Sequence, residues 1–308
     1  VTAVQRAPAL PPETAASARA AVVAAVVDRL VGDGGDLRVP TVGVTGSQGK
    51  TTTCRMLEAI LADAGHTVAG TGSQGVRIGG RTVLDGDRSG GGAARSALLD
   101  PSVDAGVFEF ARGGLLKRGM TLDGVDVGVV LNVRDNHVGV DGLRDSDDLA
   151  RVKSTVVRFA RRAVVLNADD PRCLAMRAVA RAPESWLVAP GGRSRELVAH
   201  LASGGPVAWR EGDGDAVRLV FERPGGAPQR VDPRAIPATL GGLARVKVEN
   251  ALFAIAAAAA LGHDPARSVH ALQGFDADAQ ANPGRLNLLR GAELTVLIDT
   301  PDGEAPWR

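Results

Sequence analysis

The chain has 308 residues, which is enough to bury a sizeable core and to form one large domain or two ordinary ones. Its 36 Lys and Arg residues oppose 35 Asp and Glu residues, and a net charge of +1 gives no indication of binding to nucleic acid or to an acidic membrane surface. The two cysteines, Cys54 and Cys173, exclude a disulfide framework, and both fall in predicted helices, where we expect buried thiols.

An apolar Ala/Val stretch lies near the N-terminus, at Ala20–Val27. Its eight residues are too few to span a bilayer. We therefore expect an amphipathic lead-in helix and linker in residues 1–38 of a cytoplasmic protein that does not contact a membrane.

A glycine-punctuated loop follows the first predicted strand. Residues 43–53 read Gly-Val-Thr-Gly-Ser-Gln-Gly-Lys-Thr-Thr-Thr, between an apolar β-branched run and a segment with helical spacing. This strand, loop and helix order is typical of a phosphate-binding loop. In such a loop, backbone N–H groups and a helix N-terminus face a polyphosphate, while Lys50 meets the terminal phosphates and Thr51 reaches a Mg²⁺. The sequence therefore predicts binding of a nucleoside triphosphate.

The loop departs from the commonest form of the motif, because Val44 stands where a glycine is expected. A glycine-rich turn with an exposed lysine and no ligand is the alternative interpretation. Three threonines directly after Lys50 would then be a poor helix start without purpose, which favours phosphate binding.

Short β-rich runs alternate with helical runs along most of the chain, which predicts an α/β fold with a mostly parallel sheet flanked by helices. From Pro206 to Val231, alternating runs broken by glycine turns predict a small antiparallel hairpin insertion at the periphery. Residues Gly86–Arg95 are predicted to form a mobile loop. The predicted strands are Thr41–Thr45, Thr67–Gly70, Ala105–Phe110, Val125–Val133, Ala163–Asn167 and Ser185–Ala189.

Several helix ends are marked by their residue types. Gly65 suits the left-handed residue that closes the helix begun at Lys50. Asp170-Pro171 and Asp264-Pro265 each give an N-cap followed by a proline in the first turn. The Ala-rich segment Asn250–Leu261, stopped by Gly262, predicts a helix packed closely against the sheet.

Three side chains with chemical potential follow predicted strands or lie on the next helix. Glu109 ends a strand, His137 follows another strand, and Lys153 lies on the helix after that. Ligands of open parallel sheets bind at the carboxyl ends of strands, where Glu109 could hold the same Mg²⁺ as Thr51. Taken singly, each also fits a plain interpretation: a solvated carboxylate, a hydrogen-bonded loop histidine and a surface charge.

Nine motifs in a fixed order decide between these interpretations. The sequence resembles the Mur ligase family of ATP-dependent amide-forming enzymes, and within it the Mur-like half of the cyanophycin synthetases, over residues 16–299. The resemblance rests on Val-Thr-Gly-Ser-Gln-Gly-Lys-Thr-Thr-Thr (44–53), Ile-Gly-Gly-Arg (78–81), Asp-Ala-Gly-Val-Phe-Glu-Phe-Ala-Arg-Gly-Gly-Leu-Leu (104–116), Asp-Val-Gly-Val-Val-Leu-Asn (126–132), His-Val-Gly (137–139), Asp-Leu-Ala-Arg-Val-Lys-Ser (148–154), Val-Leu-Asn-Ala-Asp-Asp-Pro (165–171), Glu-Asn-Ala-Leu-Phe-Ala-Ile-Ala-Ala (249–257) and Asn-Pro-Gly-Arg (282–285).

The resemblance implies roles for individual residues. Thr51 and Glu109 would hold one Mg²⁺ and His137 a second, while Lys153 matches a carbamylated lysine, whose anionic oxygens suit Mg²⁺. Asn250 matches an asparagine on the adenine side and Arg285 an arginine that contacts the nucleotide. Asn167 and Asp170 fall in a family segment, with an N-cap role for Asp170 at least as well supported as a ligand role. The implied catalytic residues are Lys50, Glu109, His137 and Lys153, and the implied ATP-binding residues are Gly46, Ser47, Gln48, Gly49, Lys50, Thr51, Thr52, Asn250 and Arg285.

The implied chemistry is formation of an amide through an acyl phosphate, with ATP and Mg²⁺ as cofactors. In cyanophycin synthetases this half joins arginine to the β-carboxyl of aspartate, which is the specific substrate hypothesis. The implied partners are an amino acid, a carboxylate-bearing peptide and a separate ATP-grasp or C-terminal domain protein. The sequence does not decide the oligomeric state.

The chain also departs from the family pattern. Phe110, Asn136 and Lys247 stand where Thr, Asp and Asn are usual, and Asp299 is followed by nine residues in place of a whole third domain. We predict a central ATP-binding domain at residues 39–290 and the start of a C-terminal domain at 291–308.

The departures leave three interpretations of the chain: a fragment, a split enzyme that needs a partner, and a degenerate relative. Three functions are also possible: a ligase, a nucleotide-binding module without catalysis, and an unrelated phosphate-loop kinase or NTPase. The joint presence of Glu109, His137 and Lys153 disfavours the kinase or NTPase.

Overall fold

The computed structural model describes residues 21–22, 38–135, 139–276, 282–291 and 294–300. The chain divides into two compact units, Val1–Val39 and Pro40–Arg308. In the first unit the described residues are 21–22, whose backbone is helical, and 38–39. The predicted lead-in helix therefore lies almost entirely outside the described residues.

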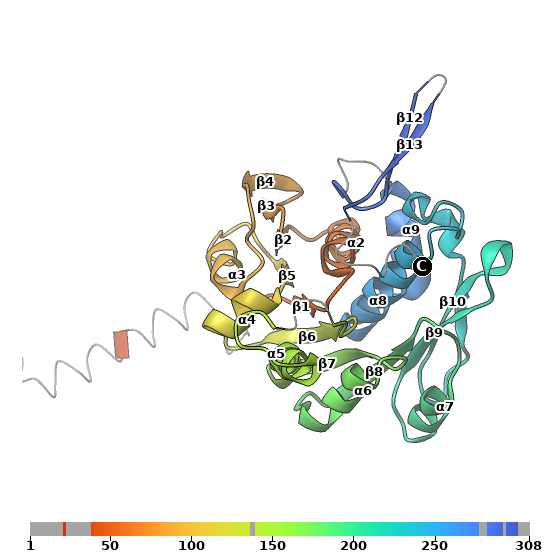
Figure 1. The fold of residues 1–308 in the computed structure, drawn as a ribbon, viewed down its shortest axis with the longest axis horizontal. Coiled ribbons are helices and arrows are strands. Elements are labelled where there is room, and N and C mark those ends of the chain that lie inside the picture. Colours follow the sequence, from red (N-terminus) through yellow and green to blue (C-terminus); the bar gives the residue numbers. More distant parts are fainter. Residues whose placement is uncertain (1–20, 23–37, 136–138, 277–281, 292–293, 301–308) are drawn as a thin grey trace, which may run out of the picture. The chain divides into compact units, whose positions relative to one another are not determined.

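The second unit is built on one large sheet (Figure 1). Within the described residues it has eleven strands, in the order β11-β10-β9-β8-β7-β6-β1-β5-β2-β3-β4. The parallel part comprises β1 (Thr41–Thr45), β2 (Val68–Gly72), β5 (Ala105–Glu109), β6 (Val125–Val130), β7 (Ala160–Asn167), β8 (Glu184–Ala189) and β9 (Val207–Glu211). Because later strands are added on both sides of β1, the carboxyl end of β1 lies at the point where ligands bind in open parallel sheets.

Antiparallel strands complete both edges of this sheet. On one edge, β3 (Gly75–Ile78) pairs with β2, and β4 (Arg81–Leu84) pairs with β3. On the other edge, β10 (Arg218–Glu222) pairs with β9, and β11 (Gln229–Val231) pairs with β10. Two further strands, β12 (Asn287–Arg290) and β13 (Thr295–Ile298), form a separate antiparallel pair.

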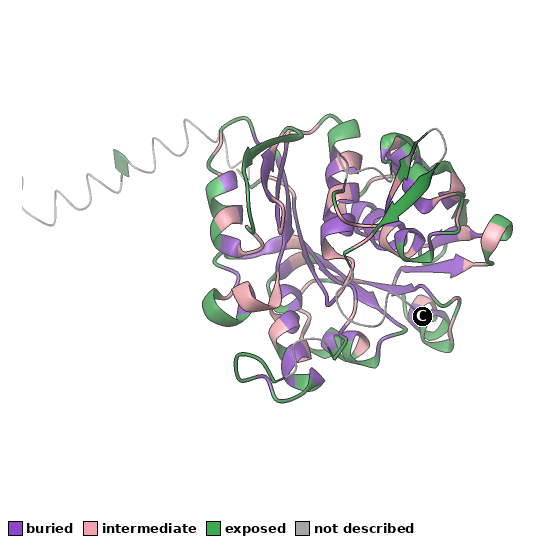
Figure 2. Ribbon diagram, turned by 45° about the horizontal axis from the view of Figure 1, so that its top comes forward, coloured by how far each residue is buried: buried purple, intermediate pink, exposed green. Residues whose placement is uncertain are grey.

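Alternate strand residues bury the two faces of the sheet against different helices. Val42 and Val44 belong to a core shared with α2 (Lys50–Asp63) and α8 (Arg245–Leu261). Val164 belongs to a second core shared with α5 (Ser146–Arg158). The central strands are accordingly buried along nearly their whole length (Figure 2), which explains why they read as apolar runs in the sequence.

Shorter helices connect the strands. The α-helices are α3 (Gly91–Ala97), α4 (Arg112–Arg118), α6 (Pro171–Ala175), α7 (Arg195–Ala202) and α9 (Pro265–Ala271). The 3₁₀ helices are η1 (Met176–Val179), η2 (Gly214–Ala216), η3 (Pro233–Ala235), η4 (Pro237–Thr239) and η5 (Leu272–Gly274).

The Ala-rich helix α8 is buried from Ala251 to Ala260. It contacts α2 and the strands β6, β7, β8 and β9. Small side chains allow this close approach on several sides at once, as predicted from the sequence. Gly262, with φ of 104°, ends the helix in the left-handed conformation.

The other helix signals are also confirmed. Gly65 has φ of 96° just after α2. The carboxylates of Asp170 and Asp264 cap α6 and α9 by accepting hydrogen bonds from backbone N–H groups of the first turn. Cys54 and Cys173 are buried free thiols in helices.

The predicted fold class is confirmed, and all six predicted strands are present with small shifts at their ends. The prediction of a loop at Gly86–Arg95 is wrong in its second half, because α3 begins at Gly91. The predicted hairpin region continues the main sheet through β9, which runs parallel to β8. Strands β3 and β4 were not predicted. Among the described residues, no helix combines the length and apolar character needed to cross a bilayer.

Candidate functional site

The loop between β1 and α2 reaches its tightest point at Gly49. This residue has φ of 86°, and a Cβ built there would lie 2.5 Å from Oδ1 of Asn250. Both the left-handed backbone and the close approach of α8 require glycine. Since glycine provides no side chain to cap α2, the first N–H groups of the helix are free of a side-chain cap and suit an anion.

Asn132, just after β6, fixes the shape of this loop. Its Oδ1 accepts a hydrogen bond from the backbone N–H of Gln48 at 2.9 Å, and its Nδ2 donates to the carbonyl of Gln48 at 3.3 Å. Its backbone carbonyl accepts from the N–H of Ser47 at 3.0 Å. The hydroxyl of Ser47 in turn accepts from the N–H of Arg134 at 2.9 Å. The loop is therefore positioned before any ligand arrives.

Two residues of the predicted Asn-Ala-Asp-Asp-Pro segment brace the strand end that carries Asn132. The Nδ2 of Asn167 donates to the carbonyl of Leu131 at 2.7 Å. Oδ2 of Asp170 accepts from the N–H of Val133 at 2.6 Å, while its Oδ1 caps α6. Both carboxylate oxygens of Asp170 thus have structural partners, which supports the N-cap interpretation.

Glu109 lies at the end of β5 and is 3 % exposed. Its Oε2 accepts a hydrogen bond from Oγ1 of Thr51 at 2.9 Å and another from the N–H of Ser73 at 3.4 Å. A Cβ on Gly72 would lie 2.8 Å from the same Oε2, so β2 has a glycine where the carboxylate passes. The structure thus brings together the two oxygen donors that were predicted to share a metal ion.

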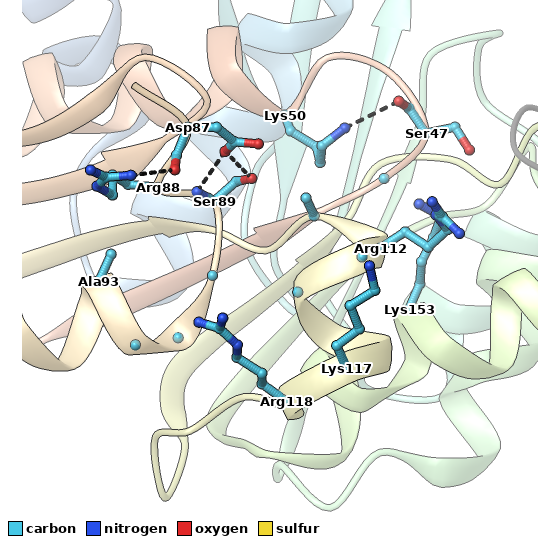
Figure 3. Close-up of a pocket in the computed structure, with 17 residues that line it drawn as sticks. Ser47, Lys50, Asp87, Arg88, Ser89, Ala93, Arg112, Lys117, Arg118 and Lys153 are labelled. Carbon is cyan, nitrogen blue, oxygen red and sulfur yellow. Dashed lines mark hydrogen bonds between the residues drawn. The ribbon is translucent and has the colours of Figure 1, made fainter. Parts of the chain in front are cut away.

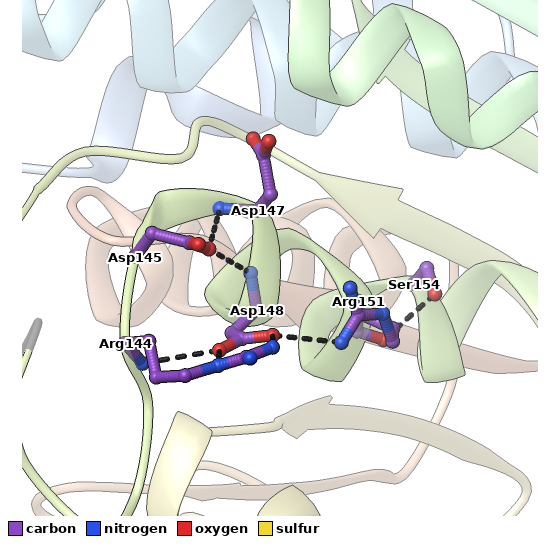
Figure 4. A network of polar contacts seen from close by, with 6 residues as sticks. All are labelled: Arg144, Asp145, Asp147, Asp148, Arg151 and Ser154. Carbon is purple, nitrogen blue, oxygen red and sulfur yellow. Dashed lines mark hydrogen bonds and ion pairs between the residues drawn. The ribbon is translucent and has the colours of Figure 1, made fainter.

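Lys153 lies on α5 and is 2 % exposed. The start of this helix is held by a polar network (Figure 4). The carboxylate of Asp145 caps the helix, and that of Asp148 accepts hydrogen bonds from Arg144 and Arg151. Hydrogen bonds from Arg144 hold the pKa of the Asp148 carboxyl well below its ordinary value. The helix that presents Lys153 therefore has a firmly anchored first turn.

Lys153 lines a cavity of about 660 Å³ beside the loop, which we call the α4 cavity. Figure 3 shows its labelled side chains around the space between the loop and α4. Six of the lining residues are cationic and one is anionic: Lys50, Arg88, Arg112, Lys117, Arg118 and Lys153 against Asp87. Arg112 pairs with Asp141 at 3.0 Å, which neutralises part of this charge. The cavity suits an anionic ligand.

A second cavity of about 240 Å³ lies against the loop and the start of α8, and we call it the α8 cavity. Its lining includes Thr51, Thr52, Glu109, Asn250 and Arg285, and it shares Ser47 and Lys50 with the α4 cavity. The Nη1 of Arg285 donates to the carbonyl of Thr300 at 3.1 Å. The two cavities therefore meet at the loop between β1 and α2.

The sequence from residue 44 to residue 202 matches the Mur ligase middle domain. The chain belongs to the Mur ligase family. Cyanophycin synthetase of Synechocystis sp. is 34% identical over 290 residues, which are 93% of this chain and 32% of that protein. A UDP-N-acetylmuramoyl-L-alanyl-D-glutamate--2,6-diaminopimelate ligase of Geobacter metallireducens is 29% identical over 85% of this chain and 49% of its own length. The chain thus spans about a third of the length of the cyanophycin synthetases it matches.

Solved structures share the Mur ligase fold at low sequence identity. A UDP-N-acetylmuramoyl-L-alanyl-D-glutamate--2,6-diaminopimelate ligase superimposes with a TM-score of 0.64 at 17% identity, covering 89% of this chain and 52% of that one. A bifunctional folylpolyglutamate synthase/dihydrofolate synthase with Mn, AMPPNP and L-glutamate bound gives a TM-score of 0.60 at 20% identity, covering 91% of this chain and 66% of that one.

In this Mur ligase chain the predicted site residues gather around one loop, apart from His137, which lies outside the described residues. The residues around the loop are Gly46, Ser47, Gln48, Gly49, Lys50, Thr51, Thr52, Glu109, Lys153, Asn250 and Arg285. Sequence reasoning assigned no role to Asn132 or Ser73. Asn132 could have been found from its place at a strand end, whereas the approach of Ser73 to Glu109 has no signal in the sequence.

Proposed function

We propose that the chain is the ATP-binding and phosphoryl-transfer part of a ligase that joins a carboxylate to an amine. The observation that carries this proposal is the meeting of two cavities of different character at Ser47 and Lys50. The α8 cavity would hold ATP, with its phosphates on the loop. The cationic α4 cavity would hold the carboxylate substrate where the terminal phosphate ends.

The chemistry of the donor oxygens fits a magnesium ion at Thr51 and Glu109. A hydroxyl and a carboxylate 2.9 Å apart are hard oxygen donors of the kind that Mg²⁺ prefers. In the part of the chain that the structure describes, no group of three or more His, Cys, Asp or Glu side chains could hold a metal ion. Phosphate and water oxygens would complete the coordination, as is usual for Mg²⁺. Lys153, after carbamylation, and His137 would serve a second ion.

The residues of this chain would act mainly by positioning and by electrostatics. A carboxylate does not expel oxide readily, so it first takes up the terminal phosphoryl group as an acyl phosphate, and an amine then displaces phosphate to give the amide. Lys50 would neutralise the charge that gathers on the transferred group, and the N–H groups of the loop would orient it. Bound Mg²⁺ would supply further charge neutralisation.

The substrate class follows from the charge of the α4 cavity. Its cationic side chains other than Lys153, which is anionic once carbamylated, would attract a peptide that carries several carboxylates. We propose an acidic peptide as the acceptor and, by the similarity to cyanophycin synthetases, arginine as the amine and the β-carboxyl of aspartate as the carboxylate. The separate domain that closes over the site in such enzymes, on this chain or on a partner, would complete it.

The test is phosphate release from ATP in the presence of Mg²⁺. We expect release that requires both arginine and an aspartate-containing peptide, with one amide formed per phosphate. ATP binding without such release would instead indicate a nucleotide-binding module without catalysis. Turnover that transfers the phosphoryl group to a small molecule as a stable product, without an amine, would indicate a kinase and would contradict the proposal.

A further inference from the structure

One buried cation in the α8 cavity has no role in the site described above. Lys247 lies near the start of α8 and is 2 % exposed. Its Nζ is buried and has no hydrogen-bond partner among the described residues. Lysine is rarely buried fully, and a buried ammonium without a hydrogen-bond partner is strongly unfavourable. Such an arrangement is expected where a ligand supplies the missing partner.

The described charged residues near Lys247 provide no hydrogen-bond acceptor for its ammonium group. Burial lowers the pKa of its ammonium to about 8, the negative charge of Asp299 acts in the opposite direction, and the positive charge of Arg285 lowers it further. Asp299 and Arg285 line the same cavity but make other hydrogen bonds. The carboxylate of Asp299 accepts from the N–H of Leu286 at 3.0 Å, and Arg285 donates to Thr300.

Lys247 and Asn250 both line the α8 cavity from the first turns of α8. Asn250 lies three residues later on α8, on the same face of the helix, and its Oδ1 faces the tightest point of the loop at Gly49. Lys247 lies one turn before Asn250 and lines the cavity together with Arg285 and Asp299. A nucleotide with its phosphates on the loop would lie with its ribose and base against this turn of α8.

We propose that Lys247 binds the nucleoside half of the nucleotide, donating a hydrogen bond to an acceptor atom of the ribose or the base. This inference rests on the proposed function, in which the α8 cavity holds ATP. An ammonium is a donor only, so its partner must be an acceptor such as a ribose oxygen or a purine ring nitrogen. The unsatisfied group destabilises the free protein and is satisfied when the nucleotide binds.

The experiment compares ATP with inorganic tripolyphosphate, which has the phosphates but no nucleoside. Dissociation constants for both are measured by calorimetry in Mg²⁺ for the wild type, for Lys247→Met and for Lys50→Ala. We expect Lys247→Met to weaken ATP binding by about tenfold or more, as for loss of a charged hydrogen bond, and to leave tripolyphosphate binding unchanged. Lys50→Ala should weaken both.

Unchanged ATP binding in Lys247→Met, or equal weakening of both ligands, would overturn the inference and leave the proposed function standing. Failure of the wild type to bind ATP would overturn both. The nucleotide-free Lys247→Met protein should melt at a higher temperature than the wild type, because an unpaired buried charge has been removed. If that variant does not fold, Lys247→Leu, which also lacks a hydrogen-bond donor, serves for the same comparison.

The pH dependence gives a second readout. The ligand favours the protonated amine, so ATP affinity of the wild type should fall as the pH rises through about 8, the pKa of Lys247 in the free protein. In Lys247→Met, ATP affinity should no longer fall as the pH rises through this range. If Lys247 had only a structural role, the pH dependence of ATP affinity would be the same in the variant and the wild type.

Discussion

The α8 cavity and the α4 cavity share Ser47 and Lys50, yet their walls are built differently. In the α8 cavity, Glu109 ends a buried strand and Asn250 lies on a long buried helix. In the α4 cavity, eight of the seventeen lining residues lie on α3 and α4, helices of seven residues with paired glycines in the first turn. The α8 cavity, which we propose binds the nucleotide, is therefore formed by elements of the hydrophobic core. The surface proposed to meet the substrate lies on short elements whose side chains can change without cost to the fold.

The largest effect is expected at the residue that both cavities share. Lys50→Ala removes the cation at the loop and should weaken ATP binding by about 100-fold or more, with loss of phosphate release. Calorimetry and a phosphate-release assay measure the two quantities. Undiminished ATP-dependent activity in this variant would contradict the proposed site, because the lysine shared by the two cavities would then have no role in catalysis.

Glu109→Gln tests the metal position at the edge of the α8 cavity. It keeps the size of the side chain but removes the charge, and we expect the rate to fall by roughly 10- to 100-fold with a higher requirement for Mg²⁺. Glu249→Gln is the matched control, because Glu249 lines the same cavity and pairs with Arg245 at 3.1 Å, away from Thr51. Equal effects of the two variants on the Mg²⁺ titration would argue against a specific metal site.

Arg112→Ala tests the α4 cavity alone. We expect the KM for the carboxylate substrate to rise about tenfold, because a partly buried cation is lost, while the KM for ATP stays unchanged. Arg81→Ala removes the same charge from exposed β4 and should change neither constant. A rise in the KM for ATP in Arg112→Ala would show that the two cavities do not separate the two substrates.

The smallest effect is expected from the helix caps. Asp170→Ala and Asp264→Ala each remove a capping carboxylate ahead of a proline, at a cost of about 1–2 kcal/mol in the free energy of unfolding. Denaturant unfolding measures this cost. Asp170 also holds the N–H of Val133 near the loop, so its loss should additionally weaken ATP binding, whereas Asp264→Ala should not.

Much of the fold and part of the site could be predicted because their signals are local. The loop at 43–53 lies between a strand and a helix in the sequence itself, and the central strands are apolar runs because both faces are buried. Strands β3 and β4 were missed because they are short, and every residue of β4 is exposed, which gives no alternating pattern.

The parts that could not be predicted depend on distant contacts. The place of Asn132 at a strand end marks it as a candidate, but its hydrogen bonds to Gln48, 84 positions away, have no signal in the local sequence. In the sequence, Lys247 is marked only as a departure from the asparagine that is usual in the family. Its burial follows from how α8 packs against α2 and the sheet, which only the folded structure reveals.

The position of α8 late in the chain has a consequence for synthesis. The hydroxyl of Thr53 donates to Oδ1 of Asn250, a residue made 197 positions later. As the polypeptide leaves the ribosome, the glycine turn emerges first and lacks one wall until this helix docks. On the proposed function, a nucleotide would meet the complete wall of its cavity only after the Ala-rich segment has been translated and has docked.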